Sequence, residues 1–140
     1  MALKLGKGSA FVKSRLRRLP QDDDVWEADF LSHADYWMGL VIEQEHGAVF
    51  AMRRLDALPS VNDFASLLAD ALQRPLLNVG SHRPQTIRLR RNPEWQELVP
   101  HLEELHITVV LAEDLAEWDI AAAEFQSSVK DHGFNLSDHD

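Results

Sequence analysis

Residues 25–31 read Val-Trp-Glu-Ala-Asp-Phe-Leu, and the alternation of apolar and polar side chains in this stretch decides the fold class. A period of two places Trp26, Ala28 and Phe30 on one face of an extended chain. The acidic residue Asp29 then lies on the opposite face. The pattern predicts the first strand of a sheet, with its aromatic face turned towards the core.

Two further extended runs follow this strand. Residues 36–44 and 48–55 are rich in aromatic and aliphatic side chains, and Gly47 lies between them, where glycine can adopt a positive φ. They predict a β-hairpin. Helical spacing of apolar residues begins at Ser60, a favourable N-cap, and ends before Pro75. The chain is therefore expected to pass from three strands into a helix.

Strands and helices alternate in the second half of the chain. Residues 86–90 alternate and predict a strand, and Asn92 followed by Pro93 predicts a helix start. Pro100 is expected to kink or split that helix, because proline lacks a backbone donor. Residues 107–112 form a short apolar run that is typical of a buried strand.

The last predicted helix begins near Asp114, which forms a capping pair with Glu117, and it ends at Gly133. The element order is therefore β-β-β-α-β-α-β-α. Three strands joined by short links, followed by strands that alternate with helices, indicate an α/β fold. We expect a mixed five-stranded sheet with the helices packed on it.

Charge divides the chain unevenly. Residues 1–21 carry six of the 14 basic residues and none of the 23 acidic residues. We expect them to form a basic, flexible N-terminal tail with at most one short helix. Residues 22–132 are predicted to form a single α/β domain, and residues 133–140 a frayed C-terminal tail. The acidic domain disfavours nucleic acid, whereas the tail favours nucleic acid or an acidic partner.

Cysteine is absent, which excludes disulfides, thiolate metal sites and cysteine nucleophiles. No apolar run follows the basic N-terminus, and none reaches the ~18 residues of a membrane span. We therefore expect a cytoplasmic protein with no membrane partner. The sequence also lacks a glycine-rich phosphate loop, a Gly-x-Ser-x-Gly elbow and a paired-histidine zinc motif. The sequence leaves open whether the chain binds a protein partner or forms a homodimer.

The element order and the run from Trp26 to Asp29 resemble the ribonuclease H-like fold of retroviral-type integrases, transposases and Holliday-junction resolvases. The resemblance implies that Asp29 corresponds to the first metal-binding carboxylate, and Asp119 or Glu117 to the third. The second carboxylate of those enzymes lies at or just after the fourth strand, where residues 88–92 supply arginines and an asparagine. Arginines there would repel Mg²⁺ or Mn²⁺. We expect a degenerate member with the fold but without the chemistry.

The chain also resembles a family of uncharacterised bacterial domains of unknown function. The shared features are a tryptophan near the first strand, an Arg-Pro pair before a strand, and a Leu-x-x-Leu helix that leads to Ile-x-Val. The matching residues are Trp26, Arg83-Pro84, Leu102, Leu105, Ile107 and Val109. This resemblance implies no function.

Three side chains are candidate metal ligands: Asp29, and His33 with Asp35 in the link after the first strand. Carboxylates and imidazoles bind metals, and His33 with Asp35 would need a third ligand or an oriented substrate. The alternative for this pair is a solvated loop. For Asp29 the alternative is an exposed carboxylate or one paired with an arginine.

The basic residues of the domain suggest an anion site or a partner site. The candidate residues are Arg83, Arg88, Arg90, Arg91 and Trp37. Arginines can hold an anion through bidentate contacts, and Trp37 can belong to an exposed binding patch. Alternating Arg88 and Arg90 are explained equally well as the solvent side of a strand, or as partners of Glu27 and Asp29 on the first strand.

These observations favour a non-catalytic interaction or binding domain on a ribonuclease H-like scaffold, with no cofactor. One alternative is a metal-dependent nuclease or related phosphoryl-transfer enzyme that uses Asp29 and Asp119 with Mg²⁺ or Mn²⁺. A second alternative is binding of nucleic acid or a partner through residues 1–21.

Overall fold

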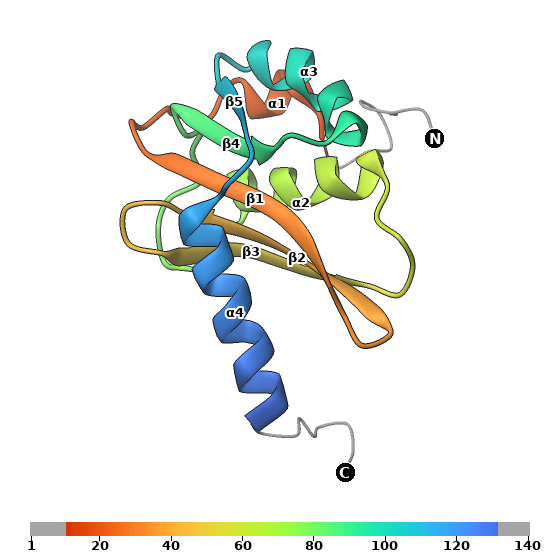
Figure 1. The fold of residues 1–140 in the computed structure, drawn as a ribbon. Helices are drawn as coiled ribbons and strands as arrows, with labels where there is room; N and C mark the ends of the chain where they lie inside the picture. The colour runs from red at the N-terminus through yellow and green to blue at the C-terminus, as the bar shows by residue number, and fades with distance from the viewer. Residues whose placement is uncertain (1–10, 132–140) are drawn as a thin grey trace.

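The computed structural model describes residues 11–131. Strands and helices follow in the expected order, with one short helix added at the N-terminus (Figure 1). The elements are α1 (Lys13–Leu16), β1 (Val25–His33), β2 (Tyr36–Glu43), β3 (Ala48–Leu55), α2 (Val61–Gln73), β4 (Thr86–Arg90), the 3₁₀ helix η1 (Pro93–Leu98), α3 (Val99–Glu103), β5 (Thr108–Ala112) and α4 (Ala116–Asp131).

The five strands form a mixed sheet in the order β3-β2-β1-β4-β5. β2 pairs antiparallel with β1 and β3, whereas β4 pairs in parallel with β1 and β5. The helices α1, α2 and α3 lie on one face of this sheet, and α4 lies on the other (Figure 1). The predicted α/β fold, with a mixed five-stranded sheet covered by helices, is confirmed.

Alternation along β1 gives the two faces of the sheet different characters. Trp26, Ala28 and Phe30 are buried in the larger core cluster, together with α2, as the period of two predicts. The opposite face of β1 carries Glu27 and Asp29, which are also buried. A buried carboxylate requires partners, so this face of the sheet must supply donors.

The helix α2 begins as the sequence predicts. The side chain of Ser60 accepts a hydrogen bond from the backbone N–H of Asp63 at 3.2 Å, and Asp63 Oδ2 accepts one from the N–H of Ser60 at 2.9 Å. The helix packs closely on β2 at Gly39, where a Cβ atom would lie 2.9 Å from Cδ2 of Leu67 in α2 and 2.5 Å from Cε2 of Phe30 on β1. Glycine at this position therefore permits the close contact between helix and sheet.

The helical segment after β4 is divided, as Pro100 predicts. The 3₁₀ helix η1 ends at Leu98, and α3 begins at Val99 with Pro100 in its first turn. Asn92 caps η1, because its Oδ1 accepts from the N–H of Glu94 at 3.0 Å. Pro100, which lacks a backbone N–H donor, therefore lies where the 3₁₀ helix gives way to the α-helix.

The N-terminal boundary of the domain differs from the prediction. Residues 11–21 belong to the folded domain, and they include α1 instead of forming a free tail. Phe11 and Leu16 are fully buried in the larger core cluster. Gln21 donates from Nε2 to the carbonyl oxygens of Pro84 at 3.1 Å and His106 at 2.7 Å. Burial of these apolar side chains anchors the segment to the domain.

The remaining predictions for the two ends of the chain lie outside the described residues. They concern residues 1–10 of the basic tail and residues 133–140 of the C-terminal tail. Within residues 11–131, none of the helices combines the length and the hydropathy that crossing a membrane would require.

Candidate functional site

Arg90 joins three elements at the place where the resemblance implies metal-binding acids. Its Nε donates to Oδ2 of Asp29 on β1 at 2.8 Å, and its Nη2 donates to Oδ1 of Asp119 on α4 at 2.9 Å. Its Nη1 donates to the carbonyl oxygen of Glu113 at 3.2 Å. Burial lowers the pKa of Arg90, but the hydrogen bonds to Asp29 and Asp119 outweigh burial and hold the pKa above its ordinary value. The guanidinium therefore stays charged between two carboxylates.

Asp29 has a partner on each of its oxygens. Oδ2 accepts from Arg90, and Oδ1 accepts from Nε1 of Trp95 at 3.3 Å. A divalent cation between Asp29 and Asp119 would have to displace a guanidinium that already supplies the positive charge there. The residues present at this position do not fit a Mg²⁺ or Mn²⁺ site, and no catalytic step is derived through one.

Glu27 binds the first turn of α4. Its Oε1 accepts from the backbone N–H of Trp118 at 2.8 Å, and its Oε2 accepts from Nε2 of Gln44 at 3.1 Å. Nε of Arg88 lies 3.6 Å from Oε2. The helix begins at Ala116 and the carboxylate that binds its first turn comes from β1, which corrects the expected local cap at Asp114.

The pairing of β4 with β1 explains the arginines of the expected anion site. Arg88 lies opposite Glu27 in the parallel register, and Arg90 reaches Asp29. The proposed alternative, in which these arginines are partners of the acids on the first strand, is the one that the structure contains. Arg91 is exposed and donates from Nη2 to the carbonyl oxygen of Leu111 at 3.3 Å.

Arg83 and Trp37 also have structural contacts. Arg83 donates from Nε to the carbonyl oxygen of Leu19 at 2.9 Å and from Nη1 to that of Leu105 at 2.5 Å. It thereby ties the N-terminal segment to the end of α3. Trp37 is half-buried and packs against the larger core cluster. The five residues of the expected site take part in separate contacts in different parts of the domain.

His33 and Asp35 are not brought together with Asp29. His33 ends β1, and its ring lies 5.5 Å from that of Tyr36 and 5.9 Å from that of Phe125. Asp35 is exposed in the following turn. Among the residues that the structure describes, the group with three potential metal ligands is a different one, in the β2–β3 turn.

That group comprises Glu43, Glu45 and His46, and it caps the hairpin turn. Glu43 is buried; its Oε2 accepts from the N–H of Glu45 at 2.8 Å, and its Oε1 accepts from the N–H of His46 at 3.0 Å. The His46 ring nitrogen Nδ1 also lies 3.0 Å from Oε1. Both oxygens of Glu43 are thus engaged within the turn, so a metal ion would compete with the contacts that shape it.

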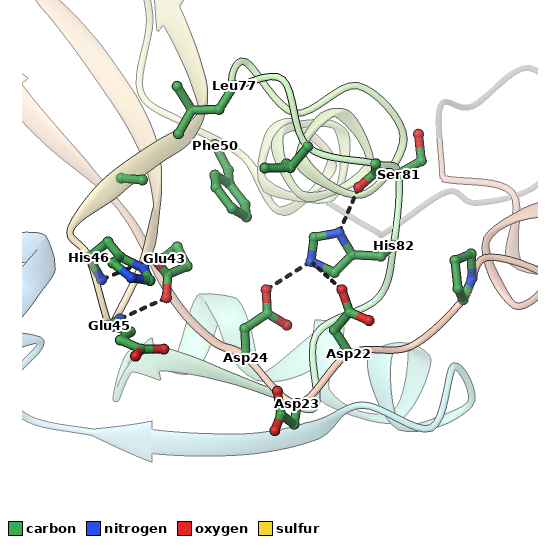
Figure 2. Close-up of a pocket in the computed structure, with 14 residues that line it drawn as sticks. Asp22, Asp23, Asp24, Glu43, Glu45, His46, Phe50, Leu77, Ser81 and His82 are labelled. Atoms are coloured by element: carbon green, nitrogen blue, oxygen red, sulfur yellow. Dashed lines mark hydrogen bonds and ion pairs between the residues drawn. The ribbon is translucent and has the colours of Figure 1, made fainter.

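A pocket of about 510 Å³ opens between this turn, the chain that enters β1 and the loop after α2 (Figure 2). Its polar centre is His82, which is buried. Nδ1 of His82 lies 2.7 Å from the carbonyl oxygen of Gly80, and Nε2 lies 2.8 Å from Oδ2 of Asp24. A carbonyl and a carboxylate both accept hydrogen bonds, so each ring nitrogen faces an acceptor, an arrangement that favours the doubly protonated form of His82.

The acids around His82 favour its protonated form. Burial lowers the pKa of His82, but the hydrogen bonds to Gly80 and Asp24 and the charges of Asp24 and Asp22 raise it above its ordinary value of 6.5. The sequence gives no sign of the acids that pair with His82, the residue before Arg83. Asp24 lies 58 residues away, so no local pattern could reveal the pair.

The stability of the protein is therefore expected to fall as the pH rises through the raised pKa of folded His82. The contribution of the ion pair is fully present below the unfolded pKa of about 6.5. Urea denaturation between pH 5.5 and 8.5 measures the dependence. The part that differs between the wild type and His82→Gln belongs to this residue, because all other titratable groups are common to both proteins. Parallel curves for the two proteins would contradict the prediction.

The fold is similar to that of a solved structure. The catalytic core domain of the HTLV-2 integrase, solved in complex with magnesium in a trimeric form, has a TM-score of 0.61 and 15% sequence identity to this chain. The match covers 88% of this chain and 78% of the integrase chain. At this identity the similarity shows the fold, and the ribonuclease H-like prediction is confirmed at that level.

The sequence matches a protein family over most of its length. A family model described as a domain of unknown function, DUF6930, matches residues 13–126. The match begins within α1, consistent with a domain that includes this helix. None of the curated proteins matches the chain.

Proposed function

Because the chain belongs to the DUF6930 family of domains of unknown function, we propose its role from the geometry alone: a non-catalytic binding domain on a ribonuclease H-like scaffold. The observation that carries this proposal is the guanidinium of Arg90 between Asp29 and Asp119. Two-metal phosphodiester chemistry needs a cluster of hard oxygen ligands around divalent cations. Here the positive charge between the acids comes from the chain itself.

Contacts made by Arg90 and Glu27 also hold the scaffold together. Arg90 links β4 to β1 and α4, and Glu27 links β1 to the first turn of α4. Acids that bind cations in a nuclease would be exposed to a substrate, whereas Asp29 is buried against Trp95. These contacts support a structural role for the carboxylates of Asp29 and Glu27. We therefore assign the domain a binding role that uses its surface.

Thermal melts with and without millimolar Mn²⁺ test this proposal. We expect the same small response to Mn²⁺ in the wild type and in Asp29→Asn, because Asp29 holds no ion. Glu103→Gln, which removes an exposed carboxylate on α3, provides the control for general effects of charge. An upward shift that occurs in the wild type and in the control but vanishes in Asp29→Asn would contradict the proposal.

The N-terminal cations give weaker support to a role in binding nucleic acid. Nζ of Lys13 lies 2.7 Å from Oε1 of Glu104, and Nε of Arg17 donates to the backbone carbonyl oxygen of Glu104 at 3.3 Å. These two charges are engaged with α3 and its end. These contacts leave fewer N-terminal cations for phosphate groups.

A further inference from the structure

The pocket beside His82 has the size of a small-molecule site. Its volume of about 510 Å³ falls within the 300–1,000 Å³ typical of such pockets. Three segments distant in sequence converge on it: the entry to β1, the β2–β3 turn and the loop after α2 (Figure 2). Paired strands and a buried histidine fix two of its sides, so the pocket is held by the fold.

One wall of the pocket is apolar and accessible. It includes the edge of Phe50, with Leu77 and Val79 from the loop after α2. Leu77 is 46% exposed and Val79 is 43% exposed, although both are large apolar side chains. The described residues leave this apolar surface in contact with solvent, so a ligand with an apolar body would gain by covering it.

The opposite wall is acidic, and part of it is not neutralised. Among residues 11–131, no lysine or arginine lines the pocket, and the positive charge of His82 is already opposed by Asp24. Asp23 and Glu45 are exposed at the rim, and their side chains have no hydrogen bond or ion pair within residues 11–131. The pocket thus presents net negative charge beside an apolar surface.

A buried acceptor inside the pocket lining lacks a donor. Oδ2 of Asp24 accepts from Trp26 and lies against His82, whereas Oδ1 of Asp24 is inaccessible to solvent and has no hydrogen-bond partner. An unpartnered carboxylate oxygen is costly, because it loses water without gaining a protein donor. Asp24 lines the pocket, so its uncompensated oxygen adds to the negative potential there.

We propose that this pocket binds an organic cation, an ammonium or a guanidinium group carried on an apolar body of small-molecule size. The apolar body covers Leu77 and Val79 beside Phe50, and the cationic head lies against the exposed carboxylates of Asp23 and Glu45, where Asp24 adds negative potential. The inference rests on the proposed binding function and names the chemical class of its ligand.

A series of three probes with similar shapes tests the charge requirement. Isothermal titration calorimetry with the full chain compares 2-phenylethylamine, 2-phenylethanol and 3-phenylpropionate at one ionic strength. The amine is expected to bind about tenfold to a hundredfold more tightly than the alcohol, as the loss of a charge-assisted hydrogen bond implies. The carboxylate should not bind. Equal binding of amine and alcohol, or no binding of the amine, would overturn the proposal.

Paired variants locate the site. Asp23→Asn with Glu45→Gln removes the free rim charges and is expected to weaken binding of the amine about tenfold. Glu103→Gln with Glu124→Gln removes the same charge from exposed positions outside the pocket and should change binding less than twofold. An equal loss in both double variants would show a general effect of net charge and would overturn the proposal.

Two further measurements distinguish this proposal from simple cation binding, and its failure from a failure of the proposed function. Ethylammonium, which lacks the apolar body, is expected to bind at least tenfold more weakly than 2-phenylethylamine. Equal affinity for both compounds would contradict the proposed ligand class. A Mn²⁺ response that depends on Asp29 would instead contradict the non-catalytic role and leave the pocket result unchanged, so the two failures are distinguishable.

Discussion

Phe11→Ala is expected to lower the free energy of unfolding by about 3–5 kcal/mol, and Leu16→Ala by about 2–5 kcal/mol. Both side chains are fully buried against the cluster that contains α2. Truncation removes apolar contacts and leaves a cavity that the surrounding helices fill only in part. Urea denaturation followed by tryptophan fluorescence measures both losses.

Arg18→Ala is the matched control for this prediction, because Arg18 is exposed on the same segment. It should change the free energy of unfolding by less than about 0.5 kcal/mol. Unchanged stability in Phe11→Ala and Leu16→Ala would show that residues 11–21 do not belong to the cooperative core. If the prediction holds, deleting residues 1–21 unfolds the domain, and any binding lost with that deletion reports unfolding.

The error at the N-terminus shows what a sequence pattern can miss. Two buried side chains, Phe11 and Leu16, lie among cations, and four residues of helix are too few for a periodic signal. By contrast, β3 and β4 match their predicted ranges, and α2 lies within its predicted range, because alternation and capping are local properties. Local patterns therefore predicted the elements, and the packing of a short segment depended on distant partners.

The same distinction applies to the candidate site. The pairing of Arg90 with Asp29 could be anticipated, because neighbouring strands bring their alternating charges together. The role of Glu27 at the start of α4 could not, since Trp118 is 91 residues away. Nor could the pocket, whose three segments meet only after the β2–β3 hairpin and the loop after α2 have been placed.

Arg90→Met is expected to lower the free energy of unfolding by about 3 kcal/mol. The substitution keeps a long side chain but leaves the carboxylate of Asp29 buried, with Trp95 as its remaining partner. An uncompensated buried charge costs more than the lost hydrogen bond alone. Asp119→Asn breaks the other half of the bridge, but Asp119 is half exposed, so its loss should cost less than about 1 kcal/mol.

A double-mutant cycle decides whether the charge pair is responsible. In the Arg90→Met background, Asp29→Asn is expected to cost at least about 1 kcal/mol less than it does in the wild type, because the buried charge is then already unpaired. Urea denaturation of the four proteins gives the coupling free energy. Additive effects would show that Arg90 acts through its packing against Trp118, whose ring centroid lies 5.4 Å from the guanidinium carbon. Coupling of the expected sign would mean that this scaffold uses an internal cation to hold β1, β4 and α4 together through the acid that the resemblance assigns to metal binding.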